Sequence, residues 1–382
     1  MRLHFRGLFL FIILALTIFM ILEPRESFQA AAAGFKLWYA VLVPALLPFF
    51  IVAELLISSG FTHYMGRILE PVMRPLFHLP GCSSLVMVMG FTSGFPMGAV
   101  LSRRLYEEKL LTPDEAERLA TFTNNSSPLF IIGAVGVGMF GNPHLGYILA
   151  LSHYLSNLLV GLIWSIKSSF VPVPHSTFLS LEKASPPRFN PGSLLGESIK
   201  NSLNNLLAIA GFIVFFSVLT RMTVVTGIMD MIADIFQFML GFCHLPHGVA
   251  LGMGMGLFEI TLGCQTVSQV PQGEILFKLL AISAILAFSG FSIIAQVLSI
   301  LAGTPVRPRL YLLSRLLQVI LSLPLTAIIF YLWPPVQPSI SLPGRQLIYS
   351  FDAWTISMSL MLIGLGAIGA MVLIGLLWQK DQ

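Results

Sequence analysis

Charged residues are scarce in this chain. Only 10% of its 382 residues are Asp, Glu, Lys or Arg, whereas 56% are hydrophobic. A soluble protein needs charge on about a quarter of its residues to cover its surface. The shortage therefore excludes an ordinary soluble globular protein, and apolar runs of about 20 residues predict helices that cross a lipid bilayer.

Cysteine is also rare. Cys82, Cys243 and Cys264 form no Cys-x-x-Cys pair and lie in or beside apolar stretches, so neither a disulfide framework nor a zinc site is expected. The chain has no His-Glu-x-x-His motif, and no histidine follows His247 to act as a base for Ser289. These absences argue against an intramembrane protease. We predict that the chain is not an enzyme and has no metal, no cofactor and no nucleic-acid partner.

The apolar segments predict an all-α polytopic membrane protein with about eight crossings, arranged as two inverted repeats. Residues 1–34 are expected to hold a first transmembrane helix, which is retained, and a linker. A polar stretch at 169–200 is the expected cytoplasmic linker between the repeats, and a last transmembrane helix is expected within 336–382.

Each repeat is expected to contain a spanning helix, an amphipathic helix, a re-entrant hairpin, a broken helix and a second spanning helix. In repeat one (35–168) the last three parts are 82–101, 119–140 and 145–166, and in repeat two (201–335) they are 247–270, 274–303 and 310–333. The landmarks share one offset, because Gly90 and Gly256 are 166 residues apart and Ser126 and Gly290 are 164 apart. Three crossings per repeat is an odd number, so the second repeat must be inverted relative to the first.

The placement of Lys and Arg agrees with this topology. If the first helix crosses once, sixteen of the 21 basic residues fall on one face and five on the other. We count Arg307, Arg309 and Arg315 on the richer face. Since cytoplasmic loops carry the excess of Lys and Arg, both termini are predicted to lie in the cytoplasm.

Interruptions in the spanning segments are the strongest functional signal. Each stranded backbone N–H or C=O costs several kcal/mol in hydrocarbon unless the break is buried in protein or lines a wet cavity. Half-helix N-termini at such breaks favour an anion, and nearby hydroxyls and amides supply further hydrogen bonds. The predicted substrate-binding residues are Thr92, Ser93, Asn124, Asn125, Ser126, Ser127, Glu259, Ser289 and Ser292.

A second interpretation of these residues stays open. Isolated Ser, Gly and Pro in membrane helices also serve close helix packing. That interpretation fits five consecutive residues, Asn-Asn-Ser-Ser-Pro at 124–128, poorly. For Glu259, a functional role in proton coupling or substrate contact competes with a position at the membrane surface.

Two sequence motifs resemble a known family. GFTSGFPMGA at 90–99 and TNNSSP at 123–128 resemble the nucleoside-recognition Gate family, and within it the sporulation integral membrane proteins of the YlbJ type. The order of elements is similar to the core of concentrative nucleoside transporters. The resemblance implies export of dipicolinate from the mother cell across the outer forespore membrane, through a site built from the hairpin tips and helix breaks.

The first hairpin tip departs from the nucleoside transporters, because Phe-Thr-Ser-Gly-Phe-Pro contains no acid or amide. It suits a flat aromatic dianion, with Phe91 and Phe95 flanking the ring. Expected partners are dipicolinate, the lipid bilayer, a coupling ion (sodium or proton) and further copies of the chain in a homo-oligomer. Two alternatives are an ion-coupled transporter of nucleosides or other small metabolites, and a non-transporting membrane scaffold for spore assembly.

Overall fold

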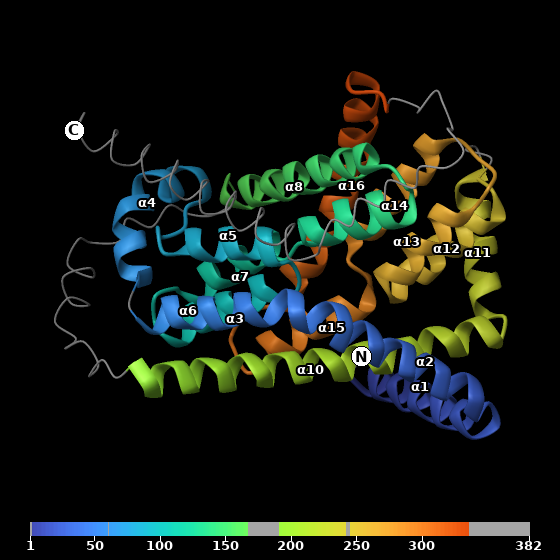
Figure 1. Cartoon of the computed structure of the whole chain (residues 1–382), viewed down its shortest axis with the longest axis horizontal. Helices are drawn as coiled ribbons and strands as arrows, with labels where there is room; N and C mark the ends of the chain where they lie inside the picture. The colour runs from blue at the N-terminus through green and yellow to red at the C-terminus, as the bar shows by residue number, and fades with distance from the viewer. Residues whose placement is uncertain (1, 60, 167–190, 242–244, 336–382) are drawn as a thin grey trace, which may run out of the picture.

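A computed structural model describes residues 2–59, 61–166, 191–241 and 245–335 (Figure 1). All regular secondary structure in these residues is helical. Four helical stretches are long and apolar enough to cross a membrane: 143–166, 192–225, 275–301 and 309–332. The predicted class, an all-α polytopic membrane protein, is confirmed. Cys243 and the last predicted transmembrane helix lie outside the described residues.

The N-terminal part is helical almost throughout. It contains α1 (Arg2–Leu22), α2 (Pro24–Leu37), the π-helical segment η1 (Trp38–Leu42) and α3 (Val43–Ser58). We expected a linker after residue 22, but α2 begins there, because Pro24 at the first helical position and four consecutive alanines favour a helix. The helix α2 packs against α10 (Pro191–Val225), which itself begins inside the expected linker 169–200.

The first half continues with α4 (Phe61–Phe77), α5 (Ser83–Ser93), α6 (Met97–Glu107), α7 (Pro113–Thr123), the π-helical segment η2 (Leu129–Met139) and α8 (Pro143–Ile166). The start of α7 is fixed by a capping box: the Thr112 hydroxyl accepts from the Glu115 N–H, and the Glu115 carboxylate accepts from the Thr112 N–H. This cap agrees with the Thr-Pro-Asp-Glu sequence. Residues 124–127 are non-helical, so the predicted helix 119–140 is broken.

The second half contains α10, α11 (Ile228–Met239), α12 (His247–Phe258), α13 (Ile260–Gln269), α14 (Ile275–Phe288), α15 (Gly290–Leu301) and α16 (Pro308–Leu332). The helices α12 and α13 form a tight hairpin with Glu259 at its tip. A Cβ added to Gly263 would lie 2.4 Å from the Cα of Gly256, and one added to Gly252 would lie 2.5 Å from Val267. Glycine is required at these positions because the two backbones nearly touch.

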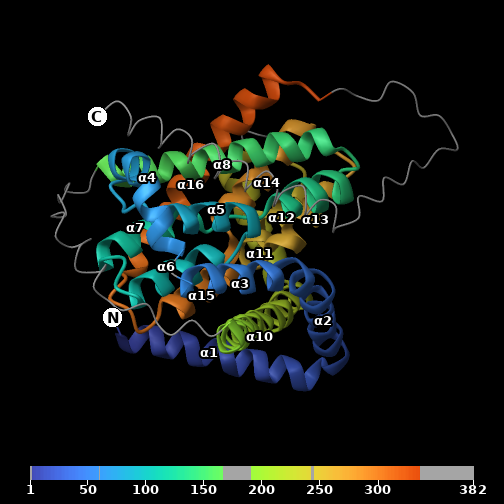
Figure 2. The same ribbon diagram turned by 60° about the vertical axis from the view of Figure 1, so that its left-hand side comes forward.

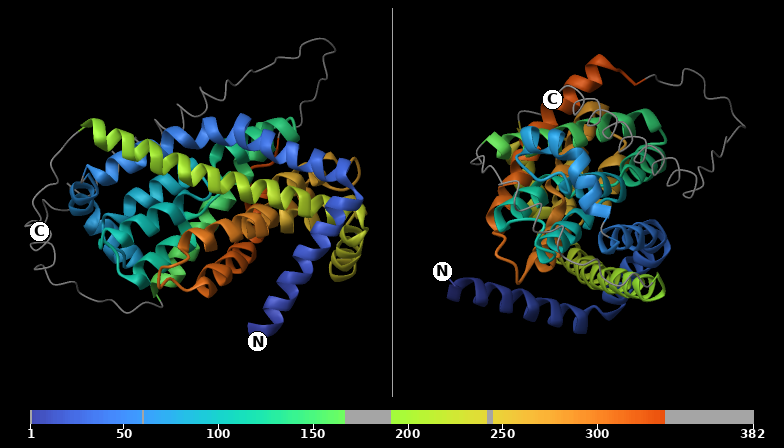
Figure 3. Two further views of the ribbon diagram at one scale, coloured as in Figure 1. Left: turned by 90° about the horizontal axis from the view of Figure 1, so that it is seen from below. Right: turned by 90° about the vertical axis from the view of Figure 1, so that its left-hand side faces the viewer.

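Corresponding helices of the two halves run in opposite directions. Along α10 and α2–α3, Arg221 pairs with Glu26 while Trp38 donates to the Leu206 carbonyl, and Figure 3 shows the helices side by side. The helices α8 and α16 are likewise antiparallel. Trp164 hydrogen-bonds to Ser314 at one end of the pair, and His144 hydrogen-bonds to the Trp333 carbonyl at the other. Figure 2 shows α8 and α10 on opposite sides of the molecule, with the hairpins and broken helices between them. Inverted repeats require corresponding helices to run in opposite directions, as these do, and the repeat itself stays a prediction.

Arg103 and Arg307, which the charge count assigns to the same membrane face, both link the two halves of the molecule. Arg307 pairs with Glu117 at 3.0 Å and with Asp114 at 3.2 Å, which joins the start of α16 to the start of α7. The hydrogen bond that the exposed Arg307 guanidinium donates to Glu117 raises the pKa of Arg307. Arg103 of α6 donates to the carbonyl of Ile300 in α15 at 2.7 Å. This end of the molecule is therefore held together across the two halves.

Candidate functional site at the helix breaks

Three glycines, which have no side chain, allow the first hairpin to pack directly against the first helix break. A Cβ added to Gly90 or Gly98 would lie 2.2 Å or 2.5 Å from the Thr123 carbonyl oxygen. Gly94, in the left-handed region with φ +87°, would meet the Ser127 nitrogen at 2.7 Å. The three glycines recur every four residues, and each contacts the segment 123–128. The two sequence motifs therefore form one structural unit.

Asn124 and Asn125 hold the non-helical segment 124–127 in place. The Asn124 side-chain oxygen accepts from the Ala99 N–H in the first turn of α6 at 2.9 Å, and its amide nitrogen donates to the Ala120 carbonyl at 2.7 Å. The Asn125 side-chain oxygen accepts from the Asn157 amide of α8. All three asparagines are 0% exposed. The hairpin, the break and α8 are therefore linked by buried amides.

Ser126 lies against α8. Its backbone N–H donates to His153 Nε2 at 3.2 Å, and its carbonyl accepts from the Tyr154 hydroxyl at 2.8 Å. Because an N–H can only donate, His153 Nε2 is an acceptor and Nδ1 carries the proton. The Gln318 amide lies beside this ring, with its nitrogen 3.3 Å from Nδ1 and donating to the His153 carbonyl at 3.4 Å. The Ser126 hydroxyl is buried and has no partner among the described residues.

The two predicted residues at the first hairpin tip differ in their environment. The Thr92 hydroxyl donates back to the Val88 carbonyl of its own helix at 2.9 Å, whereas the Ser93 hydroxyl is buried without a partner in the part of the chain described. Phe91 stacks on Tyr154 with ring centroids 5.4 Å apart. Phe95 packs instead with an apolar cluster that includes residues of the second half, so the two phenylalanines do not share one environment.

The second break consists of two consecutive left-handed residues, Ser289 (φ +75°) and Gly290 (φ +71°). A Cβ on Gly290 would lie 3.1 Å from the Gly256 carbonyl oxygen, so this break also touches the hairpin of its own half. Ser289 is fully buried. The Ser292 hydroxyl accepts from the Gln296 amide at 3.4 Å.

Glu259 occupies the tip of the second hairpin. Its carboxylate accepts from the Leu262 N–H at 2.8 Å and so caps the start of α13. The side chain is only 9% exposed, which differs from the surface position that was the competing interpretation. The structure thus places Glu259 beside the second break, and Thr92, Ser93 and residues 124–127 together at the first.

Arg315 of α16 connects the two halves at the first break, and our sequence prediction missed it. Its guanidinium donates to the Asn124 carbonyl at 3.1 Å, to the Asn157 side-chain oxygen at 3.2 Å and to the Thr121 carbonyl. The residue is 0% exposed. We had counted it with Arg307 on the charged face, and that placement is wrong, because α16 begins at Pro308 and turns Arg315 inward.

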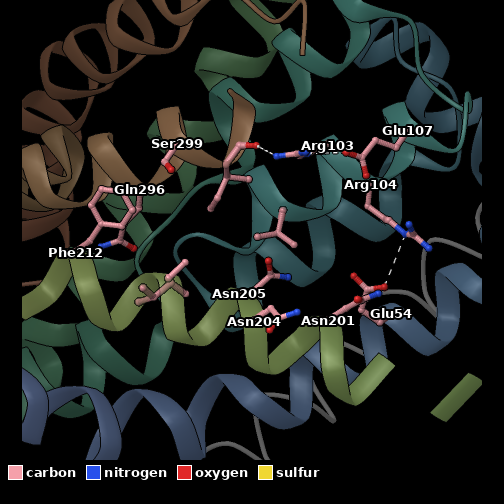
Figure 4. Close-up of a pocket in the computed structure, with 14 residues that line it drawn as sticks. Glu54, Arg103, Arg104, Glu107, Asn201, Asn204, Asn205, Phe212, Gln296 and Ser299 are labelled. Atoms are coloured by element: carbon pink, nitrogen blue, oxygen red, sulfur yellow. Dashed lines mark hydrogen bonds and ion pairs between the residues drawn. The ribbon is translucent and has the colours of Figure 1, made fainter. Parts of the chain in front are cut away.

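A polar cavity of about 410 Å³ lies between the halves (Figure 4). It is walled by α3, α6, α10 and α15, and the labelled polar residues that line it are Glu54, Arg103, Arg104, Glu107, Asn201, Asn204, Asn205, Gln296 and Ser299. Two of its lining residues are linked to the breaks: Gln296 bonds Ser292, and Val100 follows Ala99, whose N–H bonds Asn124. The sequence analysis did not single out the three asparagines of α10, although they lie at the start of the predicted repeat two (201–335).

Comparisons with known proteins agree with this architecture. Residues 39–143, which run from η1 through η2 and contain both motifs, match the family described as Gate, nucleoside recognition. The chain is 40% identical over 336 residues to the sporulation integral membrane protein YlbJ of Bacillus subtilis (strain 168), an alignment that covers 85% of this chain and 81% of YlbJ. It is also 31% identical over 156 residues to an uncharacterized protein of Alkalihalophilus pseudofirmus, covering 39% of this chain and 31% of that protein.

The helical architecture and the Gate segment define a polytopic membrane protein of sporulation. The chain belongs to the family of the sporulation integral membrane protein YlbJ. Neither relative's name describes an enzyme.

Proposed function

We propose that this protein is a secondary transporter that moves a small aromatic carboxylate, dipicolinate, out of the mother cell across the outer forespore membrane. The observation that carries the proposal is the pair of helix breaks, each covered by the hairpin tip of its own half. Such breaks are tolerated at membrane depth where they line a solute site, and transporters with broken helices bind their substrates there.

Unpaired polar groups at the breaks support a ligand. The hydroxyls of Ser93, Ser126 and Ser289 are buried and have no hydrogen-bond partner within the described ranges. Leaving a buried donor or acceptor unpaired costs about 1–3 kcal/mol. A carboxylate that accepts hydrogen bonds from such hydroxyls would recover part of this free energy, and the Phe91–Tyr154 stack offers an aromatic surface beside them.

In our proposal, the polar cavity is the route to the breaks. Arg103 and Arg104 line it, and the charge distribution assigns both to the cytoplasmic face. In our proposal, dipicolinate enters this cavity from the mother cell and reaches the breaks past Val100 and Gln296. Movement of the hairpins against the remaining helices would then open the site to the forespore side.

Transport by purified protein in liposomes tests the proposal. Dipicolinate would be loaded on one side, its passage followed by terbium luminescence, and uridine or adenosine added as competitors while the sodium and pH gradients are varied. We expect saturable dipicolinate flux that nucleosides do not inhibit. The double variant Asn125→Ala, Ser126→Ala should reduce it by at least tenfold, whereas Ser268→Ala, remote at the end of α13, should not. Flux of a nucleoside without flux of dipicolinate would refute the proposed substrate.

A scaffold without transport activity predicts a different cellular result. If the protein is the transporter, sporulating cells that lack it should accumulate dipicolinate in the mother cell and form spores that contain little. The Asn125→Ala, Ser126→Ala protein, made at normal levels, should give the same defect. Full rescue by that variant would favour the scaffold.

A further inference from the structure

Arg315 carries a positive charge in the interior without a counter-ion. Its side chain is 0% exposed and is among the largest fully buried side chains of the described residues. Its hydrogen bonds go to neutral acceptors, the carbonyls of Thr121 and Asn124 and the amide oxygen of Asn157. Within the described ranges no carboxylate lies within ion-pair distance of it. Burial of a cation without a paired anion is strongly unfavourable.

The guanidinium also keeps one donor free. Its Nε is buried and has no hydrogen-bond partner among the residues the structure describes. Carboxylates bind guanidinium groups through paired N–H donors, so a free Nε beside a bonded Nη is suited to one carboxylate oxygen. The neighbouring Tyr311, one turn earlier in α16, places its ring 5.1 Å from the Arg315 Cζ.

Tyr311 lies between Arg315 and the second break. Its hydroxyl lies near the Ser289 hydroxyl, but the two do not meet hydrogen-bond geometry, and both are buried without a partner in the described part of the chain. One helix therefore brings a guanidinium to the first break and a phenol to the second. The three unused donors, on Arg315, Tyr311 and Ser289, all belong to the second half of the protein, and Arg315 also contacts the first break through the Asn124 carbonyl.

We propose that Arg315, Tyr311 and Ser289 form the position that binds one carboxylate group of the substrate, and that Arg315 makes the site select anions over uncharged molecules of the same shape. This inference rests on the proposed transport function and specifies its chemistry. The bound carboxylate neutralises the buried guanidinium and accepts hydrogen bonds from the two hydroxyls. A nucleoside, which has no anionic group, leaves the charge uncompensated and binds weakly.

Arg315 also holds the last carbonyls of α7, and a purely structural role is the competing explanation. Ligand selectivity separates the two, because an arginine that only caps a helix would not distinguish charged from uncharged ligands. The test measures thermal stabilisation of detergent-solubilised protein by dipicolinate and by the uncharged dicarboxamide of the same pyridine ring. The variants are Arg315→Gln, Arg315→Lys and Tyr311→Phe, with Arg309→Gln, an exposed arginine on the same helix, as the matched control.

We expect the unaltered protein to bind dipicolinate and not the dicarboxamide. Arg315→Gln should weaken dipicolinate binding by roughly 30-fold or more, as expected when one partner of a buried charge pair is truncated. Tyr311→Phe should weaken it about fivefold, the effect of one ordinary hydrogen bond, and Arg309→Gln should leave it unchanged. Arg315→Lys keeps the charge and should bind more tightly than Arg315→Gln. If Arg315→Gln fails to fold, the comparison rests on Arg315→Lys and on the selectivity of the unaltered protein.

The outcomes separate this inference from the proposed function. Equal dipicolinate affinity in Arg315→Gln and the unaltered protein would overturn the role of Arg315 while leaving transport intact. If the unaltered protein ignores dipicolinate but is stabilised by benzoate or glutarate, and Arg315→Gln is not, the anion position stands and the proposed substrate fails. Equal stabilisation of the unaltered protein by the dicarboxamide and dipicolinate would overturn the anion selectivity directly.

Discussion

Replacing Gly90 with alanine tests whether the first hairpin rests on the first helix break. The added Cβ would lie 2.2 Å from the Thr123 carbonyl oxygen, whereas an ordinary contact is 3.4–4 Å. Because the atom in the way is backbone and not a flexible side chain, either the hairpin or the break must retreat by roughly 1 Å, and overpacking of this kind costs about 1–3 kcal/mol. The break carries Asn124 and Asn125, so the displacement also disturbs the proposed site.

Gly211 is the matched control for this substitution. It lies inside α10, and a Cβ added there meets nothing within 4 Å. Alanine at that position should stabilise the helix by up to about 1 kcal/mol, the difference in helix propensity. The two variants should therefore differ by roughly 1–4 kcal/mol in the free energy of unfolding, when the propensity gain and the overpacking cost are combined.

The assay combines thermal unfolding in detergent with dipicolinate flux in liposomes. Gly90→Ala should unfold at a lower temperature than the unaltered protein and lose most of its flux, whereas Gly211→Ala should match or exceed the unaltered protein in both. Equal melting temperatures and equal flux for the two variants would refute the packing of the hairpin on the break. A loss of stability without loss of flux would separate the packing from the proposed site.

Three further predictions concern single residues. Asn124→Ala removes the acceptor for the Ala99 N–H and should cost about 1–3 kcal/mol of stability, measured by thermal unfolding, together with most of the flux. Glu259→Gln keeps an oxygen to cap the Leu262 N–H, so stability should change little. If Glu259 carries the coupling proton, flux in this variant should no longer respond to a pH gradient. Ala208 of α10 lines the polar cavity. Ala208→Cys, in a background without native cysteines, should react with a membrane-impermeant thiol reagent from the cytoplasmic side of the cell membrane.

Each of these three predictions can be contradicted by a specific result. Normal flux in a correctly folded Asn124→Ala protein would show that the first break is only structural. An unchanged pH response in Glu259→Gln would exclude proton coupling through that carboxylate. Labelling of Ala208→Cys from the external side alone would reverse the proposed orientation of the cavity.

The positions of the helix breaks could be predicted because the cause is local. Asn-Asn-Ser-Ser-Pro within an apolar run competes with helical hydrogen bonding, and residues 124–127 are indeed non-helical. The start of α7 at Pro113 was equally local, because a capping box needs only Thr112 and Glu115. In the second half, the break was predicted at Ser289–Ser292, and the structure has it at the left-handed residues Ser289 and Gly290.

The partners of the breaks could not be predicted, because they depend on how helices are rotated in the fold. Arg315 follows Arg307 and Arg309 closely in sequence, and only tertiary packing turns it inward. His153 and Asn157 lie in a segment that we treated as a plain spanning helix. Their spacing could have indicated a polar face of that helix, because Ser152, His153, Ser156 and Asn157 lie on one side of it. All four are buried in the structure.

An experimental structure determined with saturating dipicolinate would show whether the helix breaks hold the substrate. We expect ligand density between residues 124–127 and Ser289, with one carboxylate group within hydrogen-bond distance of the Arg315 guanidinium. Continuous protein density that fills this region, with dipicolinate bound elsewhere or absent, would contradict it.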